Sequence, residues 1–159
     1  MMNPRIEKLV EKLTRGITKS LEVFRSVESE FWEQPIFDDP ESWNLKDLVA
    51  HFVYSEEHLL RIAQDIASGG EGSPEGIDID AFNEIEMEKL RHRSDEELLD
   101  ALDDVRTTLI DWARELDEIE LDRVGRHPVL GVCNVETVIS SIYAHQLLHM
   151  REIAPGLRK

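Results

Sequence analysis

Hydrophobic residues recur every three or four positions in four separate segments of the chain, which is the spacing of one face of an α-helix. The pattern predicts helices at about residues 4–30, 45–67, 94–117 and 134–153. The first segment carries the stripe through Ile6, Leu9, Leu13, Ile17, Leu21, Phe24 and Val27. Since no segment alternates with the two-residue period of a strand for long, the pattern indicates an all-α protein.

Three of the four predicted helices follow a residue that can cap a helix N-terminus. Asn44 precedes the second helix, and Asp47 three residues later completes a capping box. Ser94 and Glu97 form the same arrangement before the third helix, and Asn134 precedes the last one. These residues support the predicted helix beginnings.

The connection between the second and third predicted helices is long. It begins with SGGEGSPEG, whose glycines and proline stop the preceding helix near Ala67. The stretch IDAFNEIEMEKLRHR that follows is expected to be partly helical. Four long amphipathic helices predict a four-helix bundle in one domain, residues 1–159, with a crossover between helices two and three. Three aromatic residues are expected in its core: Phe24, Phe52 and Trp112.

The chain is strongly acidic. It has 18 lysine and arginine residues against 34 aspartate and glutamate residues, a formal net charge of −16. This charge repels phosphate backbones and anionic lipid, so nucleic acid and membranes are not expected partners. No apolar run is long enough for a signal peptide or a membrane span. The lone Cys133 is expected to be a small buried residue, and the protein is expected to be cytoplasmic.

Two histidines, His145 and His149, continue the apolar stripe of the last helix toward its C-terminus. Both are expected to point into the core, where each imidazole needs a hydrogen-bond partner or a metal ion. His51 lies about 10 Å into the second helix, and the pair lies about 9 Å from the end of the last helix. If these helices are antiparallel, the three imidazoles share one depth and one divalent metal. The alternative is a set of hydrogen-bonded core histidines without metal.

The other candidates for chemistry carry weaker signals. His58 lies two helical turns beyond His51, too far to bind the same ion, and is expected to be partly exposed, with a pocket-lining position as the alternative. Tyr54 and His58 are candidates for proton transfer or substrate orientation, although structural roles are favoured for both. His92 and His127, among charges and in a turn, are expected at the surface.

Residues near the histidines argue against two classes of metalloenzyme. Gln146 stands in HQLLH where HExxH metalloproteases have the glutamate that serves as general base. A di-iron carboxylate bundle needs Glu-x-x-His on two helices, and no histidine of this chain has glutamate three residues before it. Three imidazoles with an open position remain, a ligand set that suits zinc, nickel, iron or copper.

Taken together, the motifs resemble the DinB/YfiT-like superfamily. WNLKDLVAHF is similar to the W-x-x-x-D-x-x-x-H stretch of that family's second helix, and HQLLH is similar to the HxxxH of its last helix. The resemblance implies an up-down-down-up four-helix bundle, often a homodimer, with a divalent metal on His51, His145 and His149. Relatives include hydrolase-like proteins, and also transferases and isomerases that use thiols such as bacillithiol or mycothiol.

Two functional hypotheses follow. The first is a metal-dependent enzyme acting on a small-molecule substrate, in which the metal, zinc or nickel before iron or copper, activates water or a low-molecular-weight thiol. It covers both a hydrolase and a thiol-dependent S-transferase or isomerase. The second is a noncatalytic dimeric binding or stress-response module with a structural metal. A fourth protein ligand that closes the coordination shell would favour this structural role.

Overall fold

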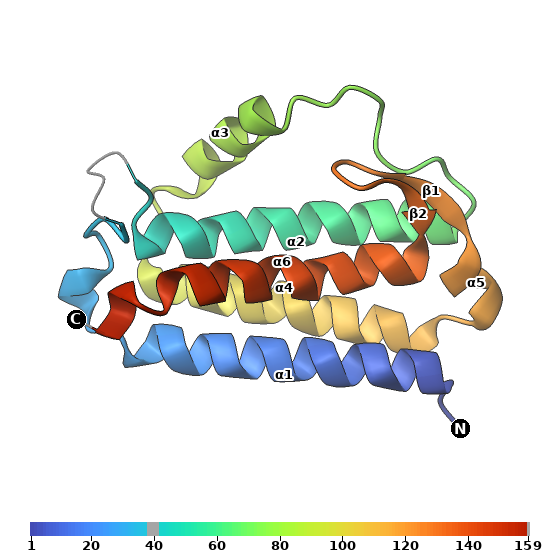
Figure 1. Ribbon diagram of the computed structural model, residues 1–159, viewed down its shortest axis with the longest axis horizontal. Coiled ribbons are helices and arrows are strands. Elements are labelled where there is room, and N and C mark those ends of the chain that lie inside the picture. The colour runs from blue at the N-terminus through green and yellow to red at the C-terminus, as the bar shows by residue number, and fades with distance from the viewer. Residues whose placement is uncertain (38–41, 159) are drawn as a thin grey trace.

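The structure, a computed structural model, describes residues 1–37 and 42–158. Four long helices dominate it (Figure 1), and shorter elements lie in the connections between them. The long helices are α1 (Pro4–Ser26), α2 (Leu45–Ala67), α4 (Asp95–Glu115) and α6 (Val135–Ile153). The shorter elements are α3 (Ile79–Leu90), α5 (Glu118–Asp122), β1 (Val124–His127), β2 (Gly131–Asn134) and single 3-10 turns at Ser29–Phe31 and Gly156–Arg158.

The four long helices form a bundle with up-down-down-up connectivity. In Figure 1, α1 and α6 run in one direction and α2 and α4 in the other. α1 therefore packs antiparallel to α4 and α6 packs antiparallel to α2, whereas α2 lies parallel to α4 and α1 lies parallel to α6. The crossover from α2 to α4 carries α3 across the outside of α2. The predicted four-helix bundle and its long crossover are confirmed.

Local signals place the helix beginnings as the sequence predicts. The side chain of Asn44 accepts a hydrogen bond from the Asp47 N–H, and Asp47 returns a bond to the Asn44 N–H. Ser94 and Glu97 form the same capping box at α4, and Asn134 caps α6 by accepting from the Thr137 N–H. These bonds satisfy backbone donors that the first helical turn leaves without partners.

The first helix is shorter than predicted, because it ends at Ser26 instead of continuing to residue 30. Val27 has an extended backbone, and the chain turns through a 3-10 helix. The turn brings Trp32 back onto the end of α1, where its ring lies 6.3 Å from that of Phe24, measured between centroids. Trp32 is 3% exposed, so burial of this large ring accounts for the early end of the helix.

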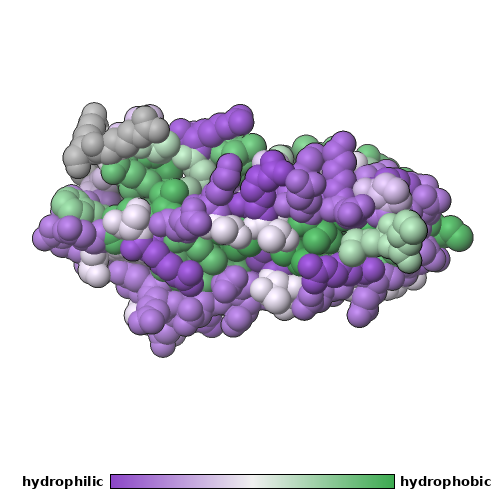
Figure 2. All heavy atoms as spheres, turned by 90° about the horizontal axis from the view of Figure 1, so that it is seen from below, coloured by the Kyte–Doolittle hydropathy of each residue, from purple (hydrophilic) through white to green (hydrophobic). Residues whose placement is uncertain are grey.

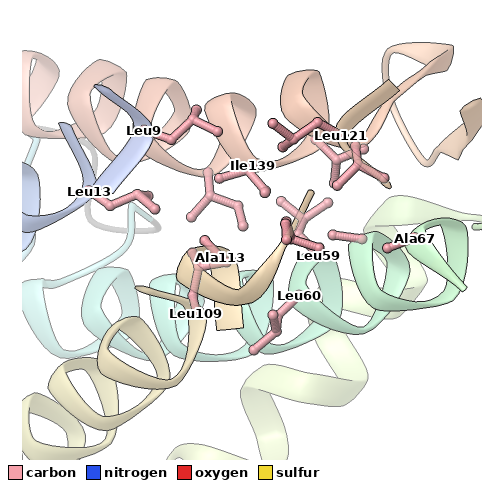
Figure 3. Close-up of a cluster of buried hydrophobic side chains, with 14 of the residues drawn as sticks. Leu9, Leu13, Leu59, Leu60, Ala67, Leu109, Ala113, Leu121 and Ile139 are labelled. Carbon is pink, nitrogen blue, oxygen red and sulfur yellow. The ribbon is translucent and has the colours of Figure 1, made fainter. Parts of the chain in front are cut away.

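The apolar faces of the helices meet in two clusters of buried side chains, and Figure 3 shows part of one of them. Phe24 and Phe52 are fully buried, as predicted, whereas Trp112 is only partly buried at the margin of the core. The labelled side chains come from five helices: Leu9 and Leu13 from α1, Leu59, Leu60 and Ala67 from α2, Leu109 and Ala113 from α4, Leu121 from α5 and Ile139 from α6.

A β-hairpin lies between α5 and α6, where the sequence analysis expected no strands. Its strands pair antiparallel from Val124 with Asn134 to His127 with Gly131. They have four residues each, and Val124 and Val132 on them are exposed, so the burial pattern required to recognise strands is lacking. Gly125 lets the hairpin lie against the end of α2, because a Cβ atom there would lie 2.4 Å from the Ile66 side chain.

The molecular surface is largely hydrophilic, in agreement with the 33% of charged residues in the chain. Figure 2, which views the molecule from the α1 side, shows mainly hydrophilic residues with hydrophobic patches between them. Cys133 is partly buried at the core margin, less enclosed than predicted. Within the described part of the chain, no helix is both long enough and apolar enough to span a membrane.

Candidate metal centre

Three histidines converge between α2 and α6. His51 lies in the second turn of α2, and His145 and His149 lie one turn apart near the end of α6. His145 Nε2 is 3.0 Å from His51 Nε2 and 3.1 Å from His149 Nε2. One ring nitrogen from each of the three lies within 4.8 Å of the other two. The antiparallel packing of α2 and α6 therefore brings together two sequence segments that are 94 residues apart.

These separations suit three nitrogen atoms that share one cation. Ring nitrogens bound to an ion at about 2.0–2.1 Å lie about 2.8–3.4 Å apart, for bond angles between square and tetrahedral. Without a cation, lone pairs or N–H groups of the three rings face one another at the same point. The residues therefore fit a divalent metal ion. No fourth histidine, cysteine, aspartate or glutamate joins this group among residues 1–37 and 42–158.

Burial keeps two of these imidazoles neutral. His51 is 6% exposed, and burial together with the neighbouring His145 and His149 lowers its pKa to about 3. Burial, followed by the effect of His149, lowers the pKa of His145 to about 4. A neutral imidazole is the form that binds a metal, so both rings are in that form at neutral pH. His145 and His149 are half-buried, less deeply than the predicted core position.

Three neighbouring side chains lie beside the outer nitrogens of the cluster. The Tyr54 hydroxyl lies 2.7 Å and the Ser55 hydroxyl 3.3 Å from His51 Nδ1, and Glu152 Oε2 lies 3.1 Å from His149 Nδ1. A proton on each Nδ1 leaves the lone pair of the corresponding Nε2 directed at the other rings; we assign these tautomers from the hydrogen-bond partners. Partners of this kind fix the orientation of metal-binding histidines in proteins. Tyr54 itself is buried behind His51, and burial raises its pKa.

Gln146 points away from the histidine cluster. It is 2% exposed, and its Oε1 atom accepts a hydrogen bond of 2.8 Å from Arg106 Nη2 in the core. Arg106 also donates to both carboxylate oxygens of Glu56 and to the carbonyl oxygen of Leu13. The position that would hold the general base of an HExxH protease is thus occupied by a residue of the bundle core.

A cavity of about 520 Å³ opens beside His145. Its walls come from α2, the first turns of α3, the turn of the hairpin and α6. His58 lines this cavity, where its ring lies 4.5 Å from that of Phe82 between centroids. His58 is half-buried, so it combines the two positions considered for it in the sequence analysis. The cavity gives a small molecule access to one of the three clustered rings.

The prediction that His127 is a surface residue is wrong, whereas His92 is exposed as predicted. His127 is 5% exposed, and its Nδ1 atom accepts hydrogen bonds from the N–H groups of Val129 and Leu130, each 3.0 Å long. Its Nε2 atom therefore carries the proton and donates to Ser141 Oγ at 3.0 Å. These bonds hold the hairpin turn against α6 and so shape the cavity wall.

Three residues around the site were not predicted from the sequence. Glu152 follows His149 by three positions on the same helix, and this spacing was a usable signal for a carboxylate partner. Glu56 and Arg106 lie beside apolar stripes on different helices, so nothing local reveals that they pair. Their contact depends on how α2 and α4 are rotated in the bundle.

The fold and the cluster together define a class: an up-down-down-up four-helix bundle with three convergent imidazoles on two antiparallel helices. A family model described as the DinB superfamily matches residues 8–153. The chain belongs to the DinB superfamily. None of the curated protein sequences compared with the chain matches it.

The fold is also found in solved structures of other proteins. YfiT from Bacillus subtilis, described as a probable metal-dependent hydrolase with an unusual four-helix bundle topology, matches with a TM-score of 0.79 and 16% identity, over 99% of this chain and 89% of that one. A mycothiol-dependent maleylpyruvate isomerase matches with a TM-score of 0.74 and 17% identity, over 93% of this chain. The match covers 60% of the isomerase chain. At these identities the likeness establishes the fold.

Proposed function

We propose that His51, His145 and His149 bind one divalent metal ion and that the protein is a metal-dependent enzyme acting on a small molecule. The observation that carries this proposal is the convergence of three Nε2 atoms at the edge of a cavity of about 520 Å³. A structural metal is normally enclosed by four protein ligands, whereas a catalytic one keeps a position open. Three ligands beside a cavity support the enzyme over the binding module.

The side chains around the cluster have separate roles in this proposal. A bound divalent ion supplies Lewis acidity toward water, a thiol or an electrophilic group of the substrate. Tyr54 and Glu152 hold the rings of His51 and His149 so that their Nε2 atoms face inward. His145 presents the third nitrogen on the cavity side. The apolar walls of the cavity limit the access of bulk water, which strengthens polar interactions within it.

Proton transfer is assigned to His58 in preference to Tyr54. Tyr54 lies behind His51 and is not among the residues that line the cavity, whereas His58 lines it. Burial lowers the pKa of His58, so its imidazole is neutral at neutral pH and can accept a proton. Hydrolysis and thiol-dependent transfer both suit this arrangement. They differ in whether water or a low-molecular-weight thiol attacks the substrate.

Metal content tests the proposal directly. Protein purified without a histidine tag and reconstituted with zinc or nickel should hold close to one ion per chain by elemental analysis. His149→Ala should lose most of this metal, and the matched control His92→Ala, at an exposed histidine, should retain it. Equal metal in the wild type and His149→Ala would contradict the proposed ligands.

Turnover provides the second test. Esters and electrophiles are incubated with the reconstituted protein, with and without a small thiol. We expect turnover that chelation abolishes and fresh metal restores. A requirement for the thiol identifies a transferase or isomerase, and turnover without it identifies a hydrolase. Full metal occupancy in a protein that turns over none of these compounds, with or without the thiol, would favour the noncatalytic module.

A further inference from the structure

The cavity beside His145 differs from the rest of the molecule because its wall carries no charge. Charged residues make up 33% of the chain, yet none of the described residues that line the cavity is aspartate, glutamate, lysine or arginine. Much of the wall is apolar, with side chains that include Leu59, Ile79, Phe82, Pro128 and Leu148. Away from the metal centre, an ionised ligand group would lose hydration there without gaining an opposite charge, which is costly.

The two histidines in the wall away from the metal centre do not supply a positive charge either. His127 accepts two backbone N–H bonds at Nδ1, which requires an unprotonated nitrogen at that position. Burial lowers the pKa of His127, and it also lowers that of His58. A carboxylate or phosphate group therefore meets no cationic side chain in the cavity. The net charge of −16 on the whole chain repels such anions further.

The cavity does offer uncharged hydrogen-bonding groups. The hydroxyl residues Thr137 and Ser140 and the amide residue Asn83 lie in its wall. His58 Nε2 is buried and finds no hydrogen-bond partner among the described residues. Buried polar nitrogens are usually paired, so this atom is a candidate to be satisfied by a ligand group. Because His58 lies two turns of α2, about 10.5 Å, from His51, the two ends of a ligand would have different partners.

We propose that the substrate is a largely apolar small molecule that carries no charge outside its reacting group, with one hydrogen-bonding group at His58 and its reacting group at His145. The placement of the reacting group at His145 rests on the proposed function, whereas the absence of charge on the rest of the substrate follows from the cavity wall alone. A volume of about 520 Å³ lies within the range of about 300–1,000 Å³ typical of sites for drug-sized ligands.

Matched pairs of ligands test this inference. Each pair has one carbon skeleton with either an amide or a carboxylate, for example 4-phenylbutanamide and 4-phenylbutanoate, and several skeleton lengths are used. Binding to the full chain is measured by calorimetry after chelation, because a carboxylate could bind a metal ion directly. We expect the amides to bind at least about tenfold more tightly than the carboxylates. Equal or tighter binding of the carboxylates would overturn the inference, as would the failure of every pair to bind.

Measurements at high salt and on two variants at the cavity rim distinguish the effect of the cavity wall on ligand preference from the effect of the net charge of the chain. High salt screens the net charge of the chain, so a preference for the amide that arises in the cavity should persist at high salt. A preference that disappears at high salt would overturn the inference. Leu148 lines the cavity and is 56% exposed, so it tolerates substitution. Leu148→Lys should reduce the preference for the amide at least about threefold by supplying a counter-charge, and Leu148→Gln should not. An equal preference for the amide over the carboxylate in the two variants would contradict the inference.

A third variant tests the hydrogen-bonding end of the site. His58→Phe keeps a ring beside Phe82 but removes the buried nitrogen, so amide binding should weaken about threefold or more. Unchanged affinity in a variant with wild-type circular dichroism would remove His58 from the site. The outcome for the metal is independent: a chain that prefers amides but holds no metal contradicts the proposed function only. A metal-binding chain that prefers carboxylates contradicts the substrate class only.

Discussion

The buried ion pair between Glu56 and Arg106 links all four helices of the bundle. Arg106 on α4 donates to the carboxylate oxygens of Glu56 on α2 at 2.9 and 2.5 Å, to Gln146 on α6 at 2.8 Å and to the Leu13 carbonyl on α1 at 2.9 Å. Both charged side chains are at most 2% exposed. Arg106→Met keeps an apolar stem and a good helix former but leaves the carboxylate buried without its partner. The expected loss in unfolding free energy is about 3–5 kcal/mol.

The size of this loss should depend on pH. Burial raises the pKa of the Glu56 carboxyl, and the Arg106 guanidinium opposes that rise. Without the guanidinium, the pKa in the folded chain rises further above the unfolded value. The neutral acid is tolerated at low pH, and the penalty grows as the pH rises through the folded-state pKa. Arg106→Met should therefore lose less stability relative to wild type at about pH 5 than at about pH 8.

Denaturant unfolding followed by circular dichroism measures these free energies. The set is wild type, Arg106→Met, Glu56→Met and the double variant, with Arg114→Met as the control at an exposed ion pair with Asp111. The control should change stability by less than about 1 kcal/mol. The double variant removes both charges, so its loss should fall below the sum of the single losses by at least about 1 kcal/mol. A loss under about 1 kcal/mol in Arg106→Met, or additive losses, would refute the reasoning.

Three further predictions concern the histidine cluster and the hairpin. Tyr54→Phe removes the hydroxyl beside His51 Nδ1 and should weaken metal binding about 10–100-fold in a chelator competition; unchanged affinity would show that the hydroxyl does not orient the ring. Because the pKa values of His51 and His145 are lowered to about 3 and about 4, the unfolded chain takes up protons that the folded chain does not. Denaturation of the metal-free protein should show full stability above the ordinary histidine pKa of 6.5. Below pH 6.5, each of the two histidines should lower the unfolding free energy by up to about 1.4 kcal/mol per pH unit, and a profile that is flat with pH would contradict the burial of these rings. Gly131→Ala places a Cβ atom at φ +78° in the hairpin and should lower stability by about 1–2 kcal/mol in thermal unfolding; no loss would mean that the turn adopts another conformation.

The helices of the bundle could be predicted from short stretches of sequence. The beginning of α2 depends on Asn44 and Asp47, which bond to each other within one turn, and its end depends on the glycine-rich stretch that follows. The end of α1 could not be predicted in the same way. It depends on the packing of Trp32 against Phe24, a contact made only after the chain has reversed direction.

The histidine cluster was predictable in part, because His145 and His149 share one face of a helix whatever the helix packs against. Their meeting with His51 followed once α2 and α6 were taken as antiparallel, and the resemblance to a known family supported the same trio. The depth of burial was not predictable. His145 and His149 are only half-buried and His145 lines the cavity, while Gln146, between them in sequence, is the residue that enters the core.

By itself, the sequence determined the helix positions, the acidic surface and the spacing of the candidate ligands. These properties depend on hydrogen bonds and side-chain periodicity within a few residues of one another. The tertiary structure decided the pairing of Glu56 with Arg106, the burial of His127 under the hairpin turn and the uncharged cavity. Each of these requires side chains from elements far apart in the chain to meet at one point, and their meeting is set by the rotation and packing of whole helices.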